Sequence, residues 1–300
     1  MINKIRKGIK HPLHILEYIQ RHYLAPWIKD DKTYIKWNYF LGMGKFPNLE
    51  NPQTFNEKLQ WLKLYDIHPE YSRLVDKYEV KEYVKELLGE EYIIPTLGVW
   101  DRFEDIDFDK LPNQFVLKCT HDSGGLVICQ DKSKLDINKA RKKIRKSLKK
   151  NFFYAHREYP YKDVKPRIIA EKYMVDESGT ELKDYKFFCF NGKCRMLFVA
   201  TDRNIGDVKF DFFDEKFNHL PFRQGHPWAD KEIKKPAGFD RMIELSEILS
   251  KGFPHVRVDL YDINGQIYFG ELTFFHFSGN VPFHPDEWDY KVGEWLILPE

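Results

Sequence analysis

The pattern of hydrophobic positions divides the chain near residue 110. Before that point, apolar side chains recur at the helical period, most clearly over residues 73–88, and a shorter stretch predicts a helix over residues 56–64. We expect residues 1–70 to form a helical and irregular segment. Three tryptophans are predicted to anchor this segment in the core, namely Trp27, Trp37 and Trp61.

After residue 110, short strand-like runs alternate with turns and helices. Strands are predicted over residues 114–119, 126–129 and 167–173. Two hairpins, each around an Asn-Gly pair, are predicted over residues 185–201 and 255–273. Helices are expected over residues 138–150 and 239–251. Hairpins with intervening helices favour an α+β fold over a doubly wound parallel sheet.

Charge and composition exclude few classes of function. The 300 residues carry 48 basic and 46 acidic side chains, and a formal charge of +2 gives no reason to expect a nucleic-acid partner. No signal peptide is visible, and no apolar window reaches the ~18 residues that a spanning helix needs. We therefore expect a cytoplasmic protein. Residues 1–10 mix basic side chains with isoleucines, which leaves open a weak association with the inner face of a membrane.

The four cysteines show no spacing typical of a metal site. We expect them to be reduced thiols, as is usual in the cytoplasm. Cys189 and Cys194 flank the first Asn-Gly turn and could face each other across a hairpin, so a disulfide between them remains the alternative.

The last hairpin carries the most informative polar pattern. One face of it would be apolar, with Val256, Val258, Leu260 and Leu272, and the other would carry Arg257, Asp259, Glu271 and Thr273. A two-residue turn would place Asp259 and Glu271 on opposite faces. A three-residue loop would place Asp259 opposite Phe269 and Glu271 diagonally beside it, and the polar alternation favours this second register.

Two carboxylates that converge on one face of a sheet repel each other unless a cation lies between them. Such hard oxygen ligands suit Mg²⁺, which commonly takes one or two carboxylates together with substrate phosphates. The pattern therefore predicts a magnesium site at Asp259 and Glu271. An exposed sheet face with ordinary charges is the competing interpretation.

Two further stretches are consistent with nucleotide binding. Lys118 ends an apolar run directly before a loop that contains Ser123, Gly124 and Gly125, an arrangement that suits phosphate oxygens. An ordinary edge-strand lysine would look the same. The apolar run over residues 168–170 ends in Glu171 and could line a purine, and a later acid would hold the ribose hydroxyls.

In their order and spacing, these stretches resemble the ATP-grasp superfamily and, within it, the TupA-like group from polysaccharide gene clusters. The matching stretches are residues 51–58, 76–77, 115–118 with 124–125, 169–173, 184–188, and 257–260 with 270–273. The resemblance implies an ATP-grasp fold in which two α+β lobes, residues 71–166 and 167–300, grip ATP behind a helical segment formed by residues 1–70.

The resemblance also implies a role for each matching position. Lys77, Lys118 and the loop with Ser123, Gly124 and Gly125 would contact the phosphates. The adenine side would be formed by Glu171, Lys172, Tyr173 and Met174, and the ribose side by Asp184, with Lys186 close by. Asp259 and Glu271 would hold Mg²⁺, and Thr273 stands where many ATP-grasp ligases have an asparagine ligand. Catalytic contacts would come from Arg257, Arg203 and Ser278.

The function implied is an ATP-dependent carboxylate–amine ligase that forms an amide through an acyl phosphate. Its substrate would be an acidic sugar or an amino acid in capsule or cell-wall polysaccharide biosynthesis. A glycosyltransferase, a sugar kinase on the same fold and a non-catalytic ATP-binding module remain as alternatives. The sequence does not predict an oligomeric state.

Overall fold

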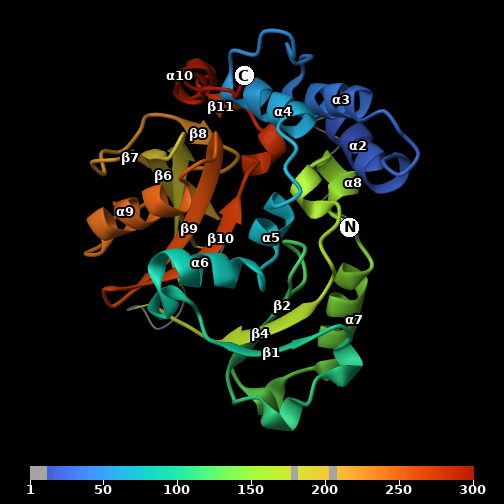
Figure 1. Ribbon diagram of the computed structural model, residues 1–300, viewed down its shortest axis with the longest axis vertical. Coiled ribbons are helices and arrows are strands. Elements are labelled where there is room, and N and C mark those ends of the chain that lie inside the picture. Colours follow the sequence, from blue (N-terminus) through green and yellow to red (C-terminus); the bar gives the residue numbers. More distant parts are fainter. Residues whose placement is uncertain (1–11, 177–181, 203–207) are drawn as a thin grey trace.

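The computed structural model describes residues 12–176, 182–202 and 208–300. The first part is helical, with α2 (Pro12–Ile19), the π-turn η1 (Gln20–Leu24), α3 (Asp31–Met43) and α4 (Phe55–Tyr65) (Figure 1). The sequence explains the start of α4, because Thr54 and Glu57 form a capping box that satisfies free amides at the first turn. Of the three tryptophans predicted to be anchors, only Trp61 packs against the core, whereas Trp27 and Trp37 are exposed.

The helix predicted over residues 73–88 is two helices, α5 (Tyr71–Val75) and α6 (Val80–Leu88). The break follows from Asp76, whose backbone is extended and whose carboxylate accepts hydrogen bonds from the amides of Tyr78 and Glu79. A short acidic side chain that binds nearby amides in this way competes with helix continuation. Arg167 donates to the same carboxylate at 2.9 Å and fixes the corner.

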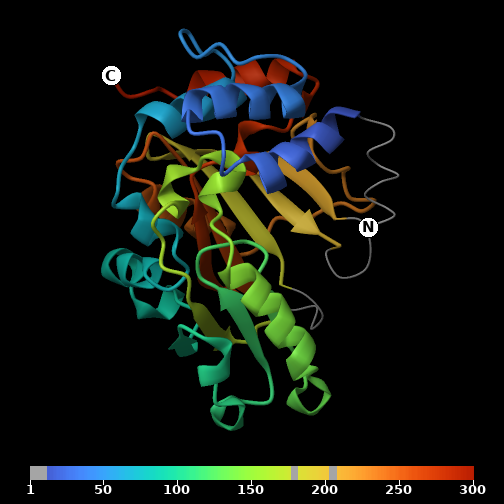
Figure 2. The ribbon, with the colours of Figure 1, turned by 90° about the vertical axis from the view of Figure 1, so that its right-hand side faces the viewer.

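A small antiparallel sheet lies at the lower end of the molecule (Figures 1 and 2). Its order is β1-β4-β2-β3, formed by β1 (Thr96–Trp100), β4 (Ile168–Lys172), β2 (Phe115–Cys119) and β3 (Leu126–Cys129). The helix α7 (Ile137–Leu148) packs Ala140 and Ile144 against it and leaves its basic side chains exposed. Strand β4 belongs to this sheet although it lies beyond residue 166, where the boundary between the two lobes was predicted.

A larger antiparallel sheet forms the centre of the molecule, in the order β10-β9-β5-β6-β7. Its strands are β5 (Asp184–Phe190), β6 (Lys193–Thr201), β7 (Lys209–Asp214), β9 (His255–Ile263) and β10 (Gln266–Thr273). The helix α9 (Phe239–Leu249) covers one face, where Phe187 meets Phe239. On the other face Phe188 packs against Phe55 of α4. The α+β prediction is confirmed.

The remaining elements are short or close the ends of the large sheet. They are α8 (Phe153–His156), α10 (Glu287–Trp295), β8 (Arg223–Gln224), β11 (Phe283–His284) and the 3₁₀ turns η2 (Glu90–Tyr92), η3 (Phe103–Asp105), η4 (Phe108–Lys110), η5 (Lys132–Lys134), η6 (Tyr159–Tyr161) and η7 (His276–Gly279).

All four cysteines are buried free thiols, and Cys189 and Cys194 face each other in the β5–β6 ladder without a disulfide bond. In the described part of the chain, every helix falls short of the length and apolarity required to traverse a bilayer.

Candidate active site

The β9–β10 hairpin brings Asp259 and Glu271 together, but through a register that differs from the predicted one. Ile263 pairs with Gln266, so the turn has two residues and not three, and the ladder runs regularly to the pair Leu260–Phe269. A β-bulge at Gly270 then shifts the register and places Glu271 directly opposite Asp259. Glycine suits this bulge because a Cβ atom there would lie 3.0 Å from the Asp259 carbonyl oxygen.

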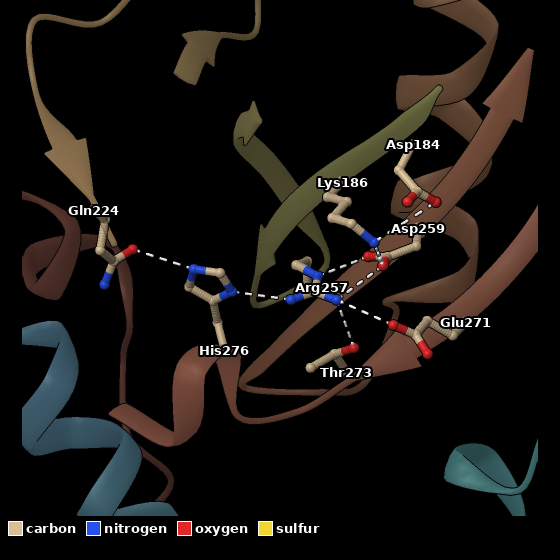
Figure 3. Close-up of polar contacts among 8 residues, drawn as sticks. All are labelled: Asp184, Lys186, Gln224, Arg257, Asp259, Glu271, Thr273 and His276. Atoms are coloured by element: carbon tan, nitrogen blue, oxygen red, sulfur yellow. Dashed lines mark hydrogen bonds and ion pairs between the residues drawn. The ribbon is translucent and has the colours of Figure 1, made fainter. Parts of the chain in front are cut away.

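Arg257 is the centre of the polar face of this hairpin (Figure 3). Its Nε donates to Asp259 Oδ1 at 2.7 Å, and its Nη2 donates to Asp259 Oδ2 at 2.8 Å. The same Nη2 reaches Glu271 Oε1 at 3.3 Å and the Thr273 hydroxyl at 3.0 Å. This fork geometry is what a guanidinium provides and an ammonium does not, so one buried cation orients all three predicted metal ligands.

His276 fixes the other side of the same guanidinium. Arg257 Nη1 lies 2.9 Å from His276 Nδ1, and His276 Nε2 lies 3.2 Å from Gln224 Oε1. Because Arg257 can only donate, Nδ1 must accept and Nε2 must carry the hydrogen. Burial, and then the charge of Arg257, holds the pKa of His276 well below its usual value, which agrees with this neutral tautomer. Neither His276 nor Gln224 was predicted from the sequence.

Lys186 connects the carboxylate pair to strand β5. Its ammonium forms a short ion pair with Asp259 and lies 3.8 Å from Asp184 Oδ1 (Figure 3). Asp184 and Lys186 occupy alternate positions of β5, so both side chains leave the same face of the strand. Asp259 is thus held between two cations, which oppose the rise in its pKa that burial causes.

Glu271 has a different electrostatic environment from Asp259. Burial on its own would raise its pKa, but the positive charges of Lys186, Lys77 and Arg257 outweigh burial and lower the pKa to about 2. Its side chain remains 39% exposed, whereas that of Asp259 is 1% exposed. Glu271 is therefore an ionised carboxylate that is open to a ligand.

On the small sheet, Glu171 is held between two lysines. Lys118 Nζ lies 2.6 Å from Glu171 Oε2, and Lys81 Nζ lies 2.5 Å from Glu171 Oε1. Burial would raise the pKa of Glu171, but the two ammonium groups lower it overall. Lys81 also donates to the Ile94 carbonyl and the Thr96 hydroxyl. Lys81 was not predicted from the sequence, although it lies four residues after Lys77.

A cavity of about 1350 Å³ lies between the small sheet and strands β5 and β9. We call it the intersheet cavity. Its lining includes six of the predicted nucleotide contacts, namely Lys118, Glu171, Lys172, Tyr173, Met174 and Asp184. Apolar side chains form much of the remaining wall, among them Val116, Leu126 and Ile128. Charged side chains on and just before α7, among them Lys134, Lys139 and Lys143, also line the cavity. A wall that mixes apolar and basic groups suits a ligand with one apolar and one anionic end.

The sequence matches the family described as TupA-like ATPgrasp over residues 57–297. This chain belongs to the TupA-like ATP-grasp family. Similar solved structures include a D-alanine–D-alanine ligase from Bacillus anthracis, with 16% identity and a TM-score of 0.40 over 67% of this chain and 57% of that one. The ADP complex of purK, an N5-carboxyaminoimidazole ribonucleotide synthetase, shows 15% identity and a TM-score of 0.45 over 81% and 56% of the two chains.

A third similar structure is the ATP-grasp ligase PsnB with a minimal precursor, Mg and ADP, with 10% identity and a TM-score of 0.39 over 73% and 57% of the two chains. This chain therefore spans little more than half the length of these three solved structures. A search among curated proteins found no match.

In this ATP-grasp protein the donor set on the β9–β10 hairpin fits Mg²⁺. The described residues contain no cluster of three or more His, Cys, Asp or Glu side chains suited to a metal. Two facing carboxylates, Asp259 and Glu271, with the Thr273 hydroxyl beside them, are instead the incomplete oxygen set that Mg²⁺ completes with phosphate oxygens and water. Thr273 and both oxygens of Asp259 already accept from Arg257, so the exposed carboxylate of Glu271 is the ligand most open to a cation.

The glycine-containing loop of this ATP-grasp protein is organised around Asp122. Its carboxylate accepts from the Gly125 amide at 3.0 Å and from the Ser147 hydroxyl, and its carbonyl accepts from Lys77 Nζ at 2.5 Å. A Cβ atom on Gly125 would lie 2.7 Å from Cys119 Cβ, so packing requires glycine there. The Gly125 amide is thus used within the loop, while Ser123 and Gly124 are exposed.

Ser278 lies in η7, directly after the metal-ligand strand, and its hydroxyl donates to the buried carboxylate of Glu158. Its carbonyl accepts from Gln60 at 2.9 Å and from Lys63 at 2.8 Å, both on α4. Phe277 and Ser278 have φ of 49° and 54°, an unfavourable conformation that these contacts maintain. Burial lowers the pKa of Lys63 to about 8. Arg203 lies outside the described residues.

Proposed function

We propose that this protein is an ATP-dependent ligase that joins a carboxylate to an amine through an acyl phosphate. One observation carries the proposal. Asp184 lines the intersheet cavity, lies 3.8 Å from Lys186, and Lys186 is paired with Asp259 of the predicted metal site. A continuous set of contacts thus links a nucleotide-sized cavity to the carboxylate pair proposed to bind a cation, an arrangement that suits phosphoryl transfer from a bound triphosphate.

In the proposed mechanism the adenine lies among the apolar walls of the cavity, and the phosphates extend past Lys118 toward the hairpin. Asp259 and Glu271 would hold Mg²⁺, which neutralises charge on the phosphoryl oxygens when bound. Arg257 keeps both carboxylates in place. Its buried charge would also stabilise negative charge on the oxygens of the transferred group.

The reaction then proceeds in two steps. The substrate carboxylate attacks the γ-phosphorus of ATP, the bond to the β,γ-bridging oxygen breaks, and ADP leaves. An amine next attacks the acyl carbon, loses a proton, and phosphate departs, which forms the amide. The loop with Ser278 follows the metal-ligand strand, but the Ser278 hydroxyl already donates to Glu158, so a role at the substrate carbonyl would require that contact to break. We propose an acidic sugar or an amino acid as substrate, within capsule or cell-wall polysaccharide assembly.

A substrate-dependent screen for ADP release tests this function. The wild-type protein would be mixed with ATP, Mg²⁺, a panel of uronic acids and a panel of amino acids. Hydroxylamine in place of the amine would trap an acyl phosphate as a hydroxamate, which a sugar kinase does not form. ADP release without hydroxamate would therefore favour the kinase, and turnover of a nucleotide sugar without ATP would favour a glycosyltransferase.

Glu271→Gln is the variant that tests the metal site within this screen. It keeps the size of the side chain and removes the open carboxylate, so turnover should fall by about 10³. Glu244→Gln removes an exposed carboxylate on α9 and is the matched control, with turnover near that of the wild type. Turnover of Glu271→Gln within a few-fold of the control would contradict the metal assignment.

A further inference from the structure

The first described helix presents apolar side chains to the solvent. Ile15, Leu16 and Ile19 of α2 are exposed, as are Tyr23 and Leu24 of η1, and Trp27 just beyond is 81% exposed. We call these six side chains the α2–η1 surface. Helix α2 lies at the outer edge of the molecule beside α3 (Figures 1 and 2). A surface helix of an ordinary globular protein buries such a stripe.

The side of this helix that contacts the protein is polar instead. Gln20 is only 5% exposed and accepts a hydrogen bond from Asn38 of α3 at 3.2 Å. Glu17, three residues before Gln20, and Arg21, the next residue, are partly buried and form an ion pair at 3.2 Å. The polarity of the helix is therefore reversed, with polar contacts inward and apolar side chains outward, so the fold itself does not explain the apolar face.

The identity of the exposed side chains indicates what covers them. Ile15, Ile19, Tyr23 and Trp27 recur at every fourth position, which aligns the helical members along one side of the segment. Tyrosine and tryptophan combine an apolar ring with one polar group, and they are enriched where hydrocarbon meets water. The surface thus has the composition of a helix that lies in a membrane interface.

Charge favours the same partner. Residues 1–29 contain six basic and one acidic side chain, a formal charge of +5, whereas residues 30–300 contain 42 basic and 45 acidic side chains, a formal charge of −3. A segment that combines net positive charge with exposed apolar side chains is attracted to anionic lipid headgroups. Two copies of this chain joined through the same surface would instead bring two positive segments together.

We propose that the α2–η1 surface docks this protein on an anionic phospholipid bilayer, with the helix lying in the headgroup region. The apolar side chains enter the boundary between headgroups and acyl chains, and the net positive charge of residues 1–29 attracts the segment to anionic lipid phosphates. This surface is remote from the intersheet cavity in sequence and shares no residue with it, so the proposal is independent of the proposed catalytic function.

Vesicle co-sedimentation tests the proposal with the whole 300-residue chain. Vesicles of phosphatidylcholine alone would be compared with vesicles that contain about 30% phosphatidylglycerol. We expect binding only to the anionic vesicles, weakened by added salt. The triple variant Leu16→Ser, Tyr23→Ser, Trp27→Ser should reduce the bound fraction at least about fivefold, because it removes apolar side chains and no charge.

The control variant, Leu87→Ser, Tyr290→Ser, Ile297→Ser, removes three exposed apolar side chains elsewhere on the surface and should bind as the wild type does. Circular dichroism and thermal unfolding verify that both variants fold. Wild-type protein that stays in the supernatant with anionic vesicles would overturn the proposal. So would equal binding of the two variants, or a lipid-free dimer, seen by light scattering, that only the α2–η1 variant disrupts.

Discussion

Individual residues in the site depend on charge partners from distant parts of the chain. Lys118 is predicted to contact the phosphates, and it lies 2.6 Å from Glu171, which Lys81 also holds. Lys118→Met should lower the affinity for ATP at least tenfold, about 1.4 kcal/mol, because a charge near the phosphates is lost. Isothermal titration measures this change. Lys85→Met removes an exposed lysine of α6 and should leave the affinity unchanged.

The depressed pKa of Glu271 predicts how stability depends on pH. A carboxylate whose pKa is about 2 when folded and near 4.5 when unfolded stabilises the folded state above the unfolded value. This stabilisation is lost as the pH falls toward 2. The difference in unfolding free energy between the wild type and Glu271→Gln should therefore be constant above about pH 5 and shrink at lower pH.

Urea unfolding at a series of pH values from neutral down to about pH 3.5 measures that difference. A difference that stays the same across the series would mean that Glu271 is not held as a carboxylate by Lys186, Lys77 and Arg257. Asp262→Asn is not a suitable control, because the Asp262 carboxylate accepts from the amides of Gly238 and Gly265.

At the scale of elements, the glycine-containing loop offers a matched pair of variants. Gly125→Ala would place a Cβ atom 2.8 Å from the Ser147 hydroxyl oxygen in a packed corner, whereas Gly124→Ala would meet only Asp122 at 3.7 Å. We expect Gly125→Ala to destabilise the protein by about 1–3 kcal/mol and Gly124→Ala to stay within about 0.5 kcal/mol. Urea unfolding checks both values. Equal effects would mean that the corner is not tightly packed.

Sequence pattern predicted most elements of the two sheets because their signals are local. The alternation over residues 256–260 and the Asn-Gly turns were sufficient to place both hairpins. The bulge at Gly270 was not predictable, because it depends on how the Gly270 backbone meets Asp259 and Tyr261. The break at Asp76 was missed for a similar reason, since a helical period continues through it and only the side-chain contacts show the interruption.

The sequence suggests candidate site residues where a residue type implies its own chemistry, as for Lys118, Asp259 and Glu271. Residues that act through another side chain carry no such signal. His276 and Gln224 orient Arg257, and Glu158 holds Ser278, yet in the sequence each is an ordinary polar residue in a loop or short strand. Positions of this kind are determined by tertiary packing, which the order of residues alone does not specify.

For the whole molecule, the cavity between two sheets predicts that nucleotide stabilises the protein. Ligand at a hundred times its dissociation constant adds about 2.7 kcal/mol to the free energy of unfolding. ATP with Mg²⁺ should therefore raise the melting temperature more than ATP with a chelator. Glu271→Gln should abolish that extra rise, which thermal unfolding measures without any substrate. A rise equal to that of the wild type would argue against Glu271 as a ligand.

Helix α4 has a consequence for how the protein can be divided. The family match begins at residue 57, two residues after α4 starts. A fragment that starts there would lack Thr54, which caps the helix, and Asn56, whose amide groups bind Asp289 at 2.9 and 3.0 Å. Gln60 and Lys63 of α4, which donate to the Ser278 carbonyl in η7, would then lie on a helix that is less firmly anchored. An expression fragment for crystallisation should begin well before Thr54, because homology ends inside the folding unit.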